Sequence, residues 1–243
     1  MAQKLLECNG LIQFPKWRFQ MKHVLLASVL AFGAFAMSAG TAMAGPEVMS
    51  FAGLQAGGEL VNTYYDGGSG SLGSTGGPNY GVDWVNATAG GAPNGLFSNA
   101  ANEPTGPNVM AFLTGSGAYM NVANGFTTGF SFYYTAALDS GSVSVYSGLN
   151  GTGNLLATLS LATNGSNPNF RQNFSNWTPI GVSFAGTAES VDFAGSAASI
   201  AFNDVTLNSS TPGTSVPEPG SLALLGTGLI GLGLVIRRRQ KRA

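Results

Sequence analysis

Histidine and cysteine are almost absent from this chain of 243 residues. The one cysteine, Cys8, and the one histidine, His23, both lie close to the N-terminus. The long middle of the chain, from Gly45 to Ser215, therefore has neither a thiol nor an imidazole. A nucleophile activated by histidine, a histidine-ligated zinc or haem, and a disulfide bond are all excluded there.

Positive charge is equally scarce in this middle region. Its single basic residue is Arg171, against nine acidic residues, so its formal charge is 1 − 9 = −8. All other lysines and arginines lie toward the two ends of the chain. A region with so little positive charge cannot neutralise a phosphate backbone, which excludes nucleic acid as a partner. The acidic side chains leave hard cations open as ligands and favour solubility outside the cell.

The N-terminal end has the three parts of a secretory signal peptide. Met21-Lys22-His23 is a short basic region, residues 24–36 are apolar, and Ala42-Met43-Ala44 is a small-x-small cleavage site before Gly45. We therefore expect a signal peptide over residues 21–44. Residues 1–20 fit poorly in front of it and are interpreted as an over-extended reading frame, the alternative being a long basic leader.

The C-terminal end also has three parts. The first is a rigid motif, Val216-Pro217-Glu218-Pro219-Gly220, in which two prolines keep the backbone extended. Residues 221–236 are uncharged and would form a helix of about 24 Å, close to the thickness of a bilayer core. A basic tail over residues 237–242 follows, in the arrangement that the positive-inside rule places in the cytoplasm. Its charged members are Arg237, Arg238, Arg239, Lys241 and Arg242.

This ending, residues 216–242, resembles the PEP-CTERM sorting signal of Gram-negative bacteria that make extracellular polysaccharide. The resemblance implies recognition by the membrane enzyme exosortase, cleavage near the motif, and transient anchoring in the inner membrane. It also implies release to the cell surface or the extracellular matrix. It covers only the last tenth of the chain and concerns the destination of the protein rather than its activity.

The region between the two ends predicts an all-β fold. Apolar residues alternate with polar ones over Phe130–Tyr134, Leu155–Leu161, Ile180–Phe184 and several shorter segments, and Asn-Gly or Asp-Ser-Gly turn signals fall between them. The spacing is typical of an antiparallel β-sandwich or jelly roll over residues 45–210, flanked by the signal helix and the transmembrane helix. Residues 211–215 are expected to be a linker.

Three details of this domain carry further expectations. Residues 66–79 and 87–106 are rich in glycine, asparagine or proline and are expected to be long loops. In the last strand, the apolar residues Ile200 and Phe202 occupy even-numbered positions, whereas Val205 and Leu207 occupy odd-numbered ones. One extra residue between the two pairs would place all four side chains on the same face, which predicts a bulge at Asn203-Asp204.

The ending of this domain, residues 200–207 (IAFNDVTL), resembles the closing strand of jelly-roll domains of the carbohydrate-binding-module type. Some of those domains hold a structural calcium ion between acidic residues of the first and last strands. The resemblance implies Asp204 as one ligand. Ala52 stands where the other acid would be, so the expectation is either no cofactor or a calcium ion at Asp204.

Three functions remain open for the domain. A structural or adhesive role in polysaccharide or biofilm needs only a hydrated, acidic, hydroxyl-rich surface, and this is the leading interpretation. A sugar-binding module would stack aromatic rings on extracellular polysaccharide, with Tyr65 and Trp177 as the candidate contacts. Glycoside cleavage would need two carboxylates from Glu59, Asp66, Asp83 and Glu103, whose spacing marks no catalytic pair. We therefore expect no enzyme activity.

Overall fold

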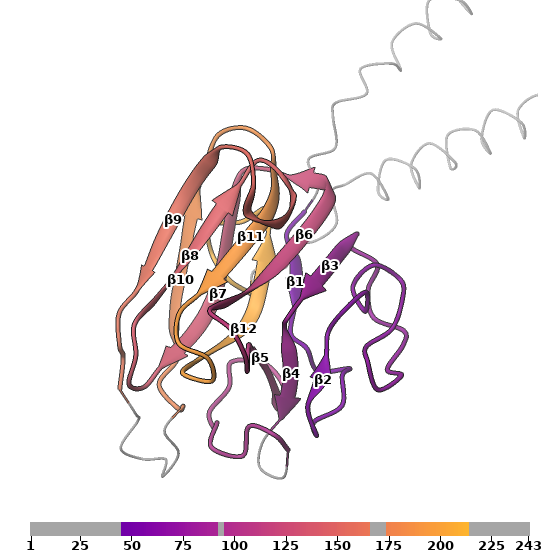
Figure 1. Cartoon of the computed structure of the whole chain (residues 1–243), viewed down its shortest axis with the longest axis vertical. Coiled ribbons are helices and arrows are strands. Elements are labelled where there is room, and N and C mark those ends of the chain that lie inside the picture. The colour runs from indigo at the N-terminus through magenta and orange to yellow at the C-terminus, as the bar shows by residue number, and fades with distance from the viewer. Residues whose placement is uncertain (1–44, 92–94, 166–173, 214–243) are drawn as a thin grey trace, which may run out of the picture. The chain divides into compact units, whose positions relative to one another are not determined.

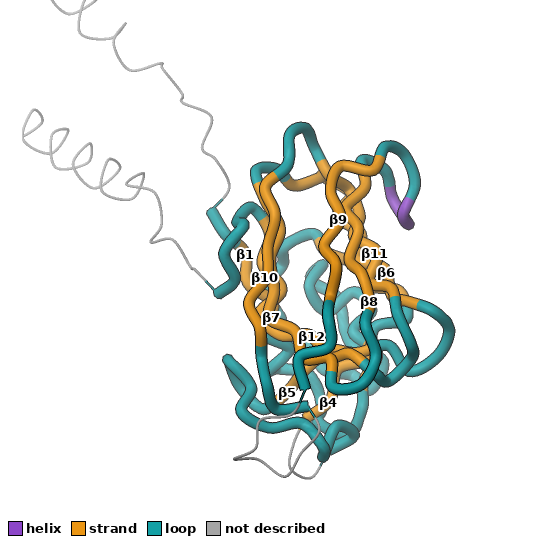
Figure 2. Tube along the Cα trace, turned by 90° about the vertical axis from the view of Figure 1, so that its left-hand side faces the viewer, coloured by secondary structure: helices purple, strands orange, loops and turns teal. Residues whose placement is uncertain are grey.

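Two antiparallel sheets face one another in a computed structural model that describes residues 45–91, 95–165 and 174–213. Figure 1 shows the strands in chain order, and Figure 2 shows the two layers from the side. Both sheets are built from short strands, and the one helical element in the described ranges is the 3-10 turn η1 at Leu149–Gly151. The predicted all-β, jelly-roll-like sandwich is confirmed.

The larger sheet, here called sheet A, has seven strands. Its order is β10-β7-β12-β5-β4-β2, and β1 pairs with the second half of β12. The strands are β1 (Glu47–Met49), β2 (Glu59–Leu60), β4 (Thr88–Gly91), β5 (Asn108–Ala111), β7 (Gly129–Ala136), β10 (Thr178–Ser183) and β12 (Ile200–Leu207).

The smaller sheet, sheet B, has five strands in the order β3-β6-β11-β8-β9. They are β3 (Val82–Val85), β6 (Gly117–Phe126), β8 (Gly141–Tyr146), β9 (Leu155–Leu161) and β11 (Ala188–Ala194). Asn124 and Gly125, which signal a turn in the sequence, lie inside β6 instead. They fall where the pairing of β6 with β11 shifts register, and Gly125 adopts a positive φ of 72°, a conformation that bulges share with turns.

The core lies between the sheets and is dominated by aromatic rings. Phe193 of β11 meets Phe202 of β12 with ring centroids 4.9 Å apart, edge to face. Phe132 and Trp84 pack on the same Phe193 ring. Since these four side chains come from both sheets and are at most 2% exposed, they join the two layers into one hydrophobic core.

The bulge expected in the last strand is present. Register along β12 and β7 shifts between Asn203 and Thr206, and Asp204 adopts a positive φ of 47°. Phe202 on one side and Val205 and Leu207 on the other all point into the core. The extra residue thus restores the inward face of the strand, as the change of parity in the sequence requires.

The loop expectations need one correction. Residues 88–91, expected in a loop, form β4, an internal strand of sheet A. Their side chains, in Thr-Ala-Gly-Gly, are small and show no alternation of apolar and polar residues, so the sequence does not predict a strand here. The loop over residues 66–79 is present but is tied to a buried carboxylate. Glu59, fully buried, accepts hydrogen bonds from the backbone N–H groups of Leu72 and Ser74 and from the Ser74 hydroxyl.

Several expectations concern residues outside the described ranges. These are the signal peptide with its cleavage site at Ala42 and Ala44, the sorting motif, the predicted transmembrane helix and the basic tail. Within the described ranges, no helix has the length and apolar character needed to cross a membrane.

Candidate polysaccharide-binding groove

A groove with a volume of about 440 Å³ lies on the outer face of sheet B. Three structural pieces form most of it: the edge strand β3, the neighbouring β6, and the turn η1, which packs against β6. The lining residues are Asp66, Gly81, Asp83, Val85, Asn121, Ala123, Asn124, Leu149 and Asn150. Sequence reasoning missed this groove, because its residues come from segments that only strand pairing brings together.

Strand alternation explains why polar residues line its floor. In β3, Val82 and Trp84 point into the core, so Asp83 and Val85 point outward. Asp83 lies directly opposite Asn121 of β6 in the antiparallel register. A carboxylate and a carboxamide therefore stand side by side at the centre of the groove.

The turn that forms one wall is held by a reciprocal pair of hydrogen bonds. The Asn121 side-chain amide donates to Asn150 Oδ1 over 2.9 Å, and the Asn150 backbone N–H donates to Asn121 Oδ1 over 2.8 Å. Asn150 has a positive φ of 55°, which asparagine tolerates better than most residues. Asn121 is 9% exposed, so this pair fixes the wall from beneath.

The rims of the groove mix exposed carboxylates with exposed apolar groups. Asp66 and Asp83 are exposed, and none of the described residues is a lysine, arginine or histidine that could pair with them. Val85 and Leu149 are 45% and 39% exposed. Such a lining accepts hydrogen bonds from hydroxyl groups and offers apolar contact to C–H faces.

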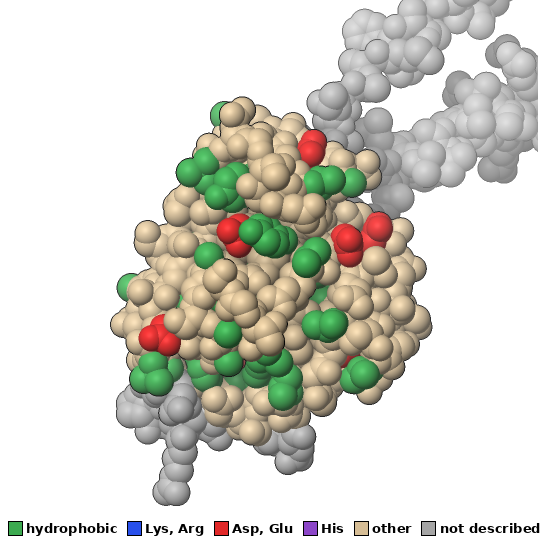
Figure 3. Space-filling model, viewed as in Figure 1, with side chains coloured by type: hydrophobic (Ala, Val, Ile, Leu, Met, Phe, Trp, Pro, Cys, Tyr) green, Lys and Arg blue, Asp and Glu red, His purple; other side chains and the backbone are tan. Residues whose placement is uncertain are grey.

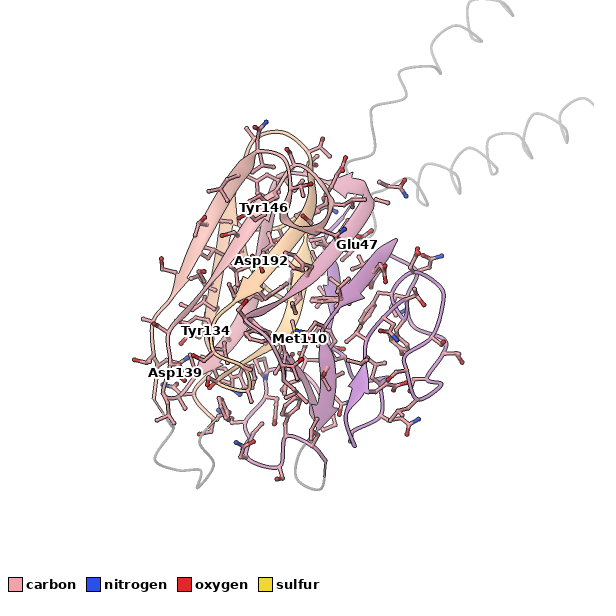
Figure 4. All side chains as sticks on the ribbon, viewed as in Figure 1. Glu47, Met110, Tyr134, Asp139, Tyr146 and Asp192 are labelled. Atoms are coloured by element: carbon pink, nitrogen blue, oxygen red, sulfur yellow. The ribbon has the colours of Figure 1, made fainter. Side chains whose placement is uncertain are left out.

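A second polar group of side chains lies beside the groove on the same face. Tyr119 of β6 is directly opposite Asp192 of β11, and Tyr146 lies on the next strand, β8 (Figure 4). Partial burial raises the pKa of Asp192, and the negative charge of Asp192, with burial and Tyr146, raises the pKa of the Tyr119 phenol. Figure 3, viewed from the side of sheet B, shows carboxylates and apolar side chains but no basic side chain among the described residues.

The two predicted aromatic contacts lie elsewhere. Tyr65 is 3% exposed and packs against Phe51, Tyr64 and Tyr80, and its hydroxyl accepts a hydrogen bond from the Phe51 backbone N–H. Its ring is thus a core element and not a surface for a sugar. Residues 62–64 form a turn, Tyr65 pairs with Val82 in an isolated bridge, and the rings of Tyr64 and Tyr65 are both buried.

Trp177 is half-buried and remains a prediction as a sugar contact. Its indole N–H donates to the Ala101 carbonyl over 3.0 Å. That bond fixes the loop next to a smaller, mostly apolar cavity of about 260 Å³ on sheet A, lined by Phe97, Asn99 and Phe174 among others. This cavity adjoins residues outside the described ranges, whereas the groove on sheet B does not.

Of the four candidate carboxylates, the structure brings two together. Asp66 and Asp83 line the groove. Glu59 is buried beneath the loop of residues 66–79, and Glu103 is half-buried in the loop between β4 and β5. Hydrolysis of a glycoside requires a carboxylic acid kept in a desolvated setting, which the two exposed groove residues lack.

Asp204 lies in the bulge of β12 and points at the loop between β4 and β5. Its Oδ2 accepts a hydrogen bond from the Thr105 hydroxyl over 2.7 Å, while its buried Oδ1 has no protein partner. Burial raises the pKa of Asp204, and the Thr105 bond opposes this only in part. No group of three or more acidic, histidine or cysteine side chains suited to a metal occurs in the described part of the chain. A single carboxylate falls short of the six to eight oxygen ligands that calcium takes, so calcium at Asp204 stays a prediction.

Residues 215–239 match the family model of the PEP-CTERM protein-sorting motif. This chain carries a PEP-CTERM sorting motif. The sorting signal indicates secretion and an extracellular or surface location, reached through a transient membrane anchor. It says nothing about the ligand of the sandwich. Among curated proteins, none matches the chain in sequence.

Several solved structures are similar to the sandwich at low identity. One is a family 6 carbohydrate-binding module of Cellvibrio mixtus lichenase 5A in complex with cellotriose, with 12% identity, 52% of this chain and 89% of that chain covered, and a TM-score of 0.35. Another is the K1 adhesin domain of Lys-gingipain from Porphyromonas gingivalis, with 14% identity, 68% and 98% covered, and a TM-score of 0.39. A third is a family 6 module of a laminarinase from Zobellia galactanivorans, with 18% identity, 51% and 100% covered, and a TM-score of 0.30.

Proposed function

We propose that exosortase sorts this PEP-CTERM protein to the surface or matrix of a Gram-negative bacterium. There it has a structural or adhesive role and binds uncharged polysaccharide through the groove on sheet B. The observation that carries the binding proposal is the lining of this groove. Carboxylates and carboxamides from β3, β6 and η1 converge beside exposed Val85 and Leu149.

The chemistry of the lining favours a neutral glycan. Asp66, Asp83 and the three asparagines supply acceptors for sugar hydroxyls, and the carboxamides also donate. The absence of basic side chains from the described residues disfavours an anionic chain, because uncompensated carboxylates would repel it. The role is binding and not cleavage, since both groove carboxylates are exposed.

The test is affinity electrophoresis of the full chain, in detergent, through gels containing neutral glucans or the host's own polysaccharide. Asp83→Asn and Asn150→Ala are expected to weaken retardation about tenfold, since each removes hydrogen bonds worth about 1.5 kcal/mol to the ligand. Asp139→Asn is the matched control, because Asp139 accepts a bond from Ser199 on a loop away from the groove. Retardation unchanged in both groove variants would refute this site, and release of reducing sugar would replace binding with catalysis.

The sorting step has its own readout. Mass spectrometry of the mature protein from the native host is expected to find a new C-terminus near Pro217–Gly220. An intact tail ending in Arg242 and Ala243 would instead mean a permanent anchor.

A further inference from the structure

The chain does not leave the sandwich at the end of β12. It turns at Asn208, which has a positive φ of 61°, and residues 208–213, here called the strap, run back over the outer face of sheet A. Figure 2 shows this end of the described chain outside β1 and β10, on the side away from sheet B. Residues 211–213, expected in a linker, are therefore part of the folded domain.

Four hydrogen bonds and a buried proline hold the strap on the sheet. The Thr128 and Ser131 hydroxyls donate to the carbonyls of Asn208 and Ser209, over 3.0 and 2.9 Å. The Thr127 backbone N–H donates to the side-chain oxygen of Asn208 over 3.1 Å. At the far end the Gly213 backbone N–H donates to Thr206 Oγ1 over 3.1 Å, and Pro212 is buried.

The outer face of sheet A is shaped for this close approach. Ser131 lies directly between Gly181 of β10 and Thr206 of β12 in the strand register, so the strap crosses a row of small side chains. A Cβ atom at Gly181 would collide with the Ser210 carbonyl. The strap consequently lies flat on the sheet and is not a mobile tether at its first residues.

This geometry limits the reach of the anchor. Gly213, the last described residue, is held on sheet A, and the predicted membrane segment begins at Ser221, eight residues later. Eight residues span at most about 28 Å when fully extended. Passing around the sandwich to turn sheet B toward the membrane would use most of this reach, about 10 Å across two strands and about 10 Å between the sheets, before side chains are counted. Leaving directly from the face of sheet A uses none of it.

The distribution of charge also favours an orientation in which sheet A faces the membrane. Strands β7 and β10 contain no charged residue, whereas Asp83 and Asp192 lie on the outward face of sheet B. Bacterial and model membranes with anionic lipids repel carboxylates within a Debye length of their surface. The other strands of sheet A do carry Glu47, Glu59 and Asp204, but Glu59 and Asp204 are buried and Glu47 is half-buried. The face over β7 and β10 is therefore the one that can lie against lipid headgroups.

We propose that the outer face of sheet A is a membrane-facing surface, held against the lipid headgroups by the strap and the short chain after it while the protein is anchored. The inference rests on the anchoring step of the proposed function. Its consequence is that the groove, on the opposite face, points away from the membrane and is open to polysaccharide before the protein is released.

The experiment places one fluorophore on each face of the full chain. In a Cys8→Ser background, Ser183→Cys labels an exposed position of β10 in sheet A, and Ser160→Cys labels an exposed position of β9 in sheet B. Each protein is reconstituted in phosphatidylcholine vesicles containing nitroxide-headgroup lipid. Quenching at position 183 is expected to exceed that at position 160 by about twofold or more, because the sheets lie about 10 Å apart.

A flexible insert is the matched control. About twenty Gly-Ser residues between Gly213 and Thr214 add a root-mean-square reach of roughly 25 Å, which is expected to make the two quenching values equal. Equal quenching without the insert, in protein that floats with the vesicles, overturns the orientation and leaves anchoring intact. Failure to float with the vesicles overturns the anchoring step and the orientation with it, while glycan binding by the groove is measured separately.

Discussion

Glu59 shows how one buried side chain orders a long glycine-rich loop. Its carboxylate accepts hydrogen bonds from the backbone N–H groups of Gln55, Leu72 and Ser74 and from the Ser74 hydroxyl. Burial alone would raise the pKa of Glu59, but these hydrogen bonds outweigh it and hold the pKa below its ordinary value. The loop wraps so closely that a Cβ atom at Gly70 would collide with the carboxylate.

Glu59→Gln is expected to destabilise the sandwich by about 2 kcal/mol, because an amide presents one N–H₂ group to donors that need an acceptor. Since the folded pKa of Glu59 is depressed, its contribution is present above the unfolded pKa and is lost as pH falls through the folded pKa. Urea unfolding at pH 7 and pH 3 measures this. The deficit of the variant should shrink at pH 3, and an equal deficit at both pH values would contradict an ionised Glu59.

The pKa of Asp204 is shifted in the opposite direction from that of Glu59. Because burial raises its folded pKa, its stabilising contribution is full below the unfolded pKa and is lost as pH rises through the folded pKa. Asp204→Asn should therefore reduce the loss of thermal stability between pH 4 and pH 7. The same melting curves test calcium. A rise in Tm with added calcium that Asp204→Asn abolishes would establish the ion at this site.

At the scale of the element, the turn η1 is the wall of the groove that side-chain hydrogen bonds hold in place. It lies on β6 and β11 through the Asn121–Asn150 pair and through Ser190, whose hydroxyl donates to the Gly148 carbonyl and accepts from the Gly151 N–H. Gly151 adopts a positive φ of 71° and sits against the Tyr119 ring, where a Cβ atom would come within 2.9 Å of it. The turn thus joins the groove to the neighbouring Tyr119–Asp192 surface.

Asn121→Ala is expected to free this turn without unfolding the sandwich. It removes two hydrogen bonds from beneath the wall, at a cost of about 1–2 kcal/mol. Amide hydrogen exchange at Asn150 and Gly151 should accelerate about tenfold, since that is the factor 1.4 kcal/mol provides. Thr158→Ala, on the exposed face of β9, is the control. Slow exchange retained in Asn121→Ala would show that Ser190 alone holds the turn.

At the scale of the whole molecule, the described residues carry nine carboxylates and no basic side chain. Glu59 and Asp204 are buried, and several of the others lie on or beside sheet B. The protein should therefore avoid polyanions as well as nucleic acid, and select uncharged chains.

Binding to a neutral glucan is accordingly expected to change less than about twofold between 20 and 300 mM salt, because no ion pairs are formed or screened. A gel that contains an acidic polysaccharide such as alginate should not retard the protein at low salt. Affinity electrophoresis in matched gels measures both. Retention by alginate that disappears in salt would place a basic surface on the molecule and contradict the charge argument.

The sequence predicts those features that depend on neighbouring residues. The strands β7, β9 and β10 follow from alternation, and the β12 bulge follows from a change of parity within eight residues. Strand β4 escaped prediction because Thr-Ala-Gly-Gly has no apolar alternation, and its place is set by its partners β2 and β5. The expectation for Tyr65 failed because residues 62–64 turn the chain and Tyr65, which pairs with Val82, packs its ring in the core.

The sequence by itself determined the destination and the chemical limits of this protein. The sorting motif is a continuous segment, and the lack of histidine, cysteine and basic residues between Gly45 and Ser215 is a matter of composition, except for Arg171. Only the tertiary structure decided where a ligand could bind and which face the anchor leaves. Both depend on strand register, which places Asp83 opposite Asn121 in sheet B and Ser131 opposite Thr206 in sheet A. Side-chain period fixes two faces for each strand, but pairing with distant segments decides which residues meet on them.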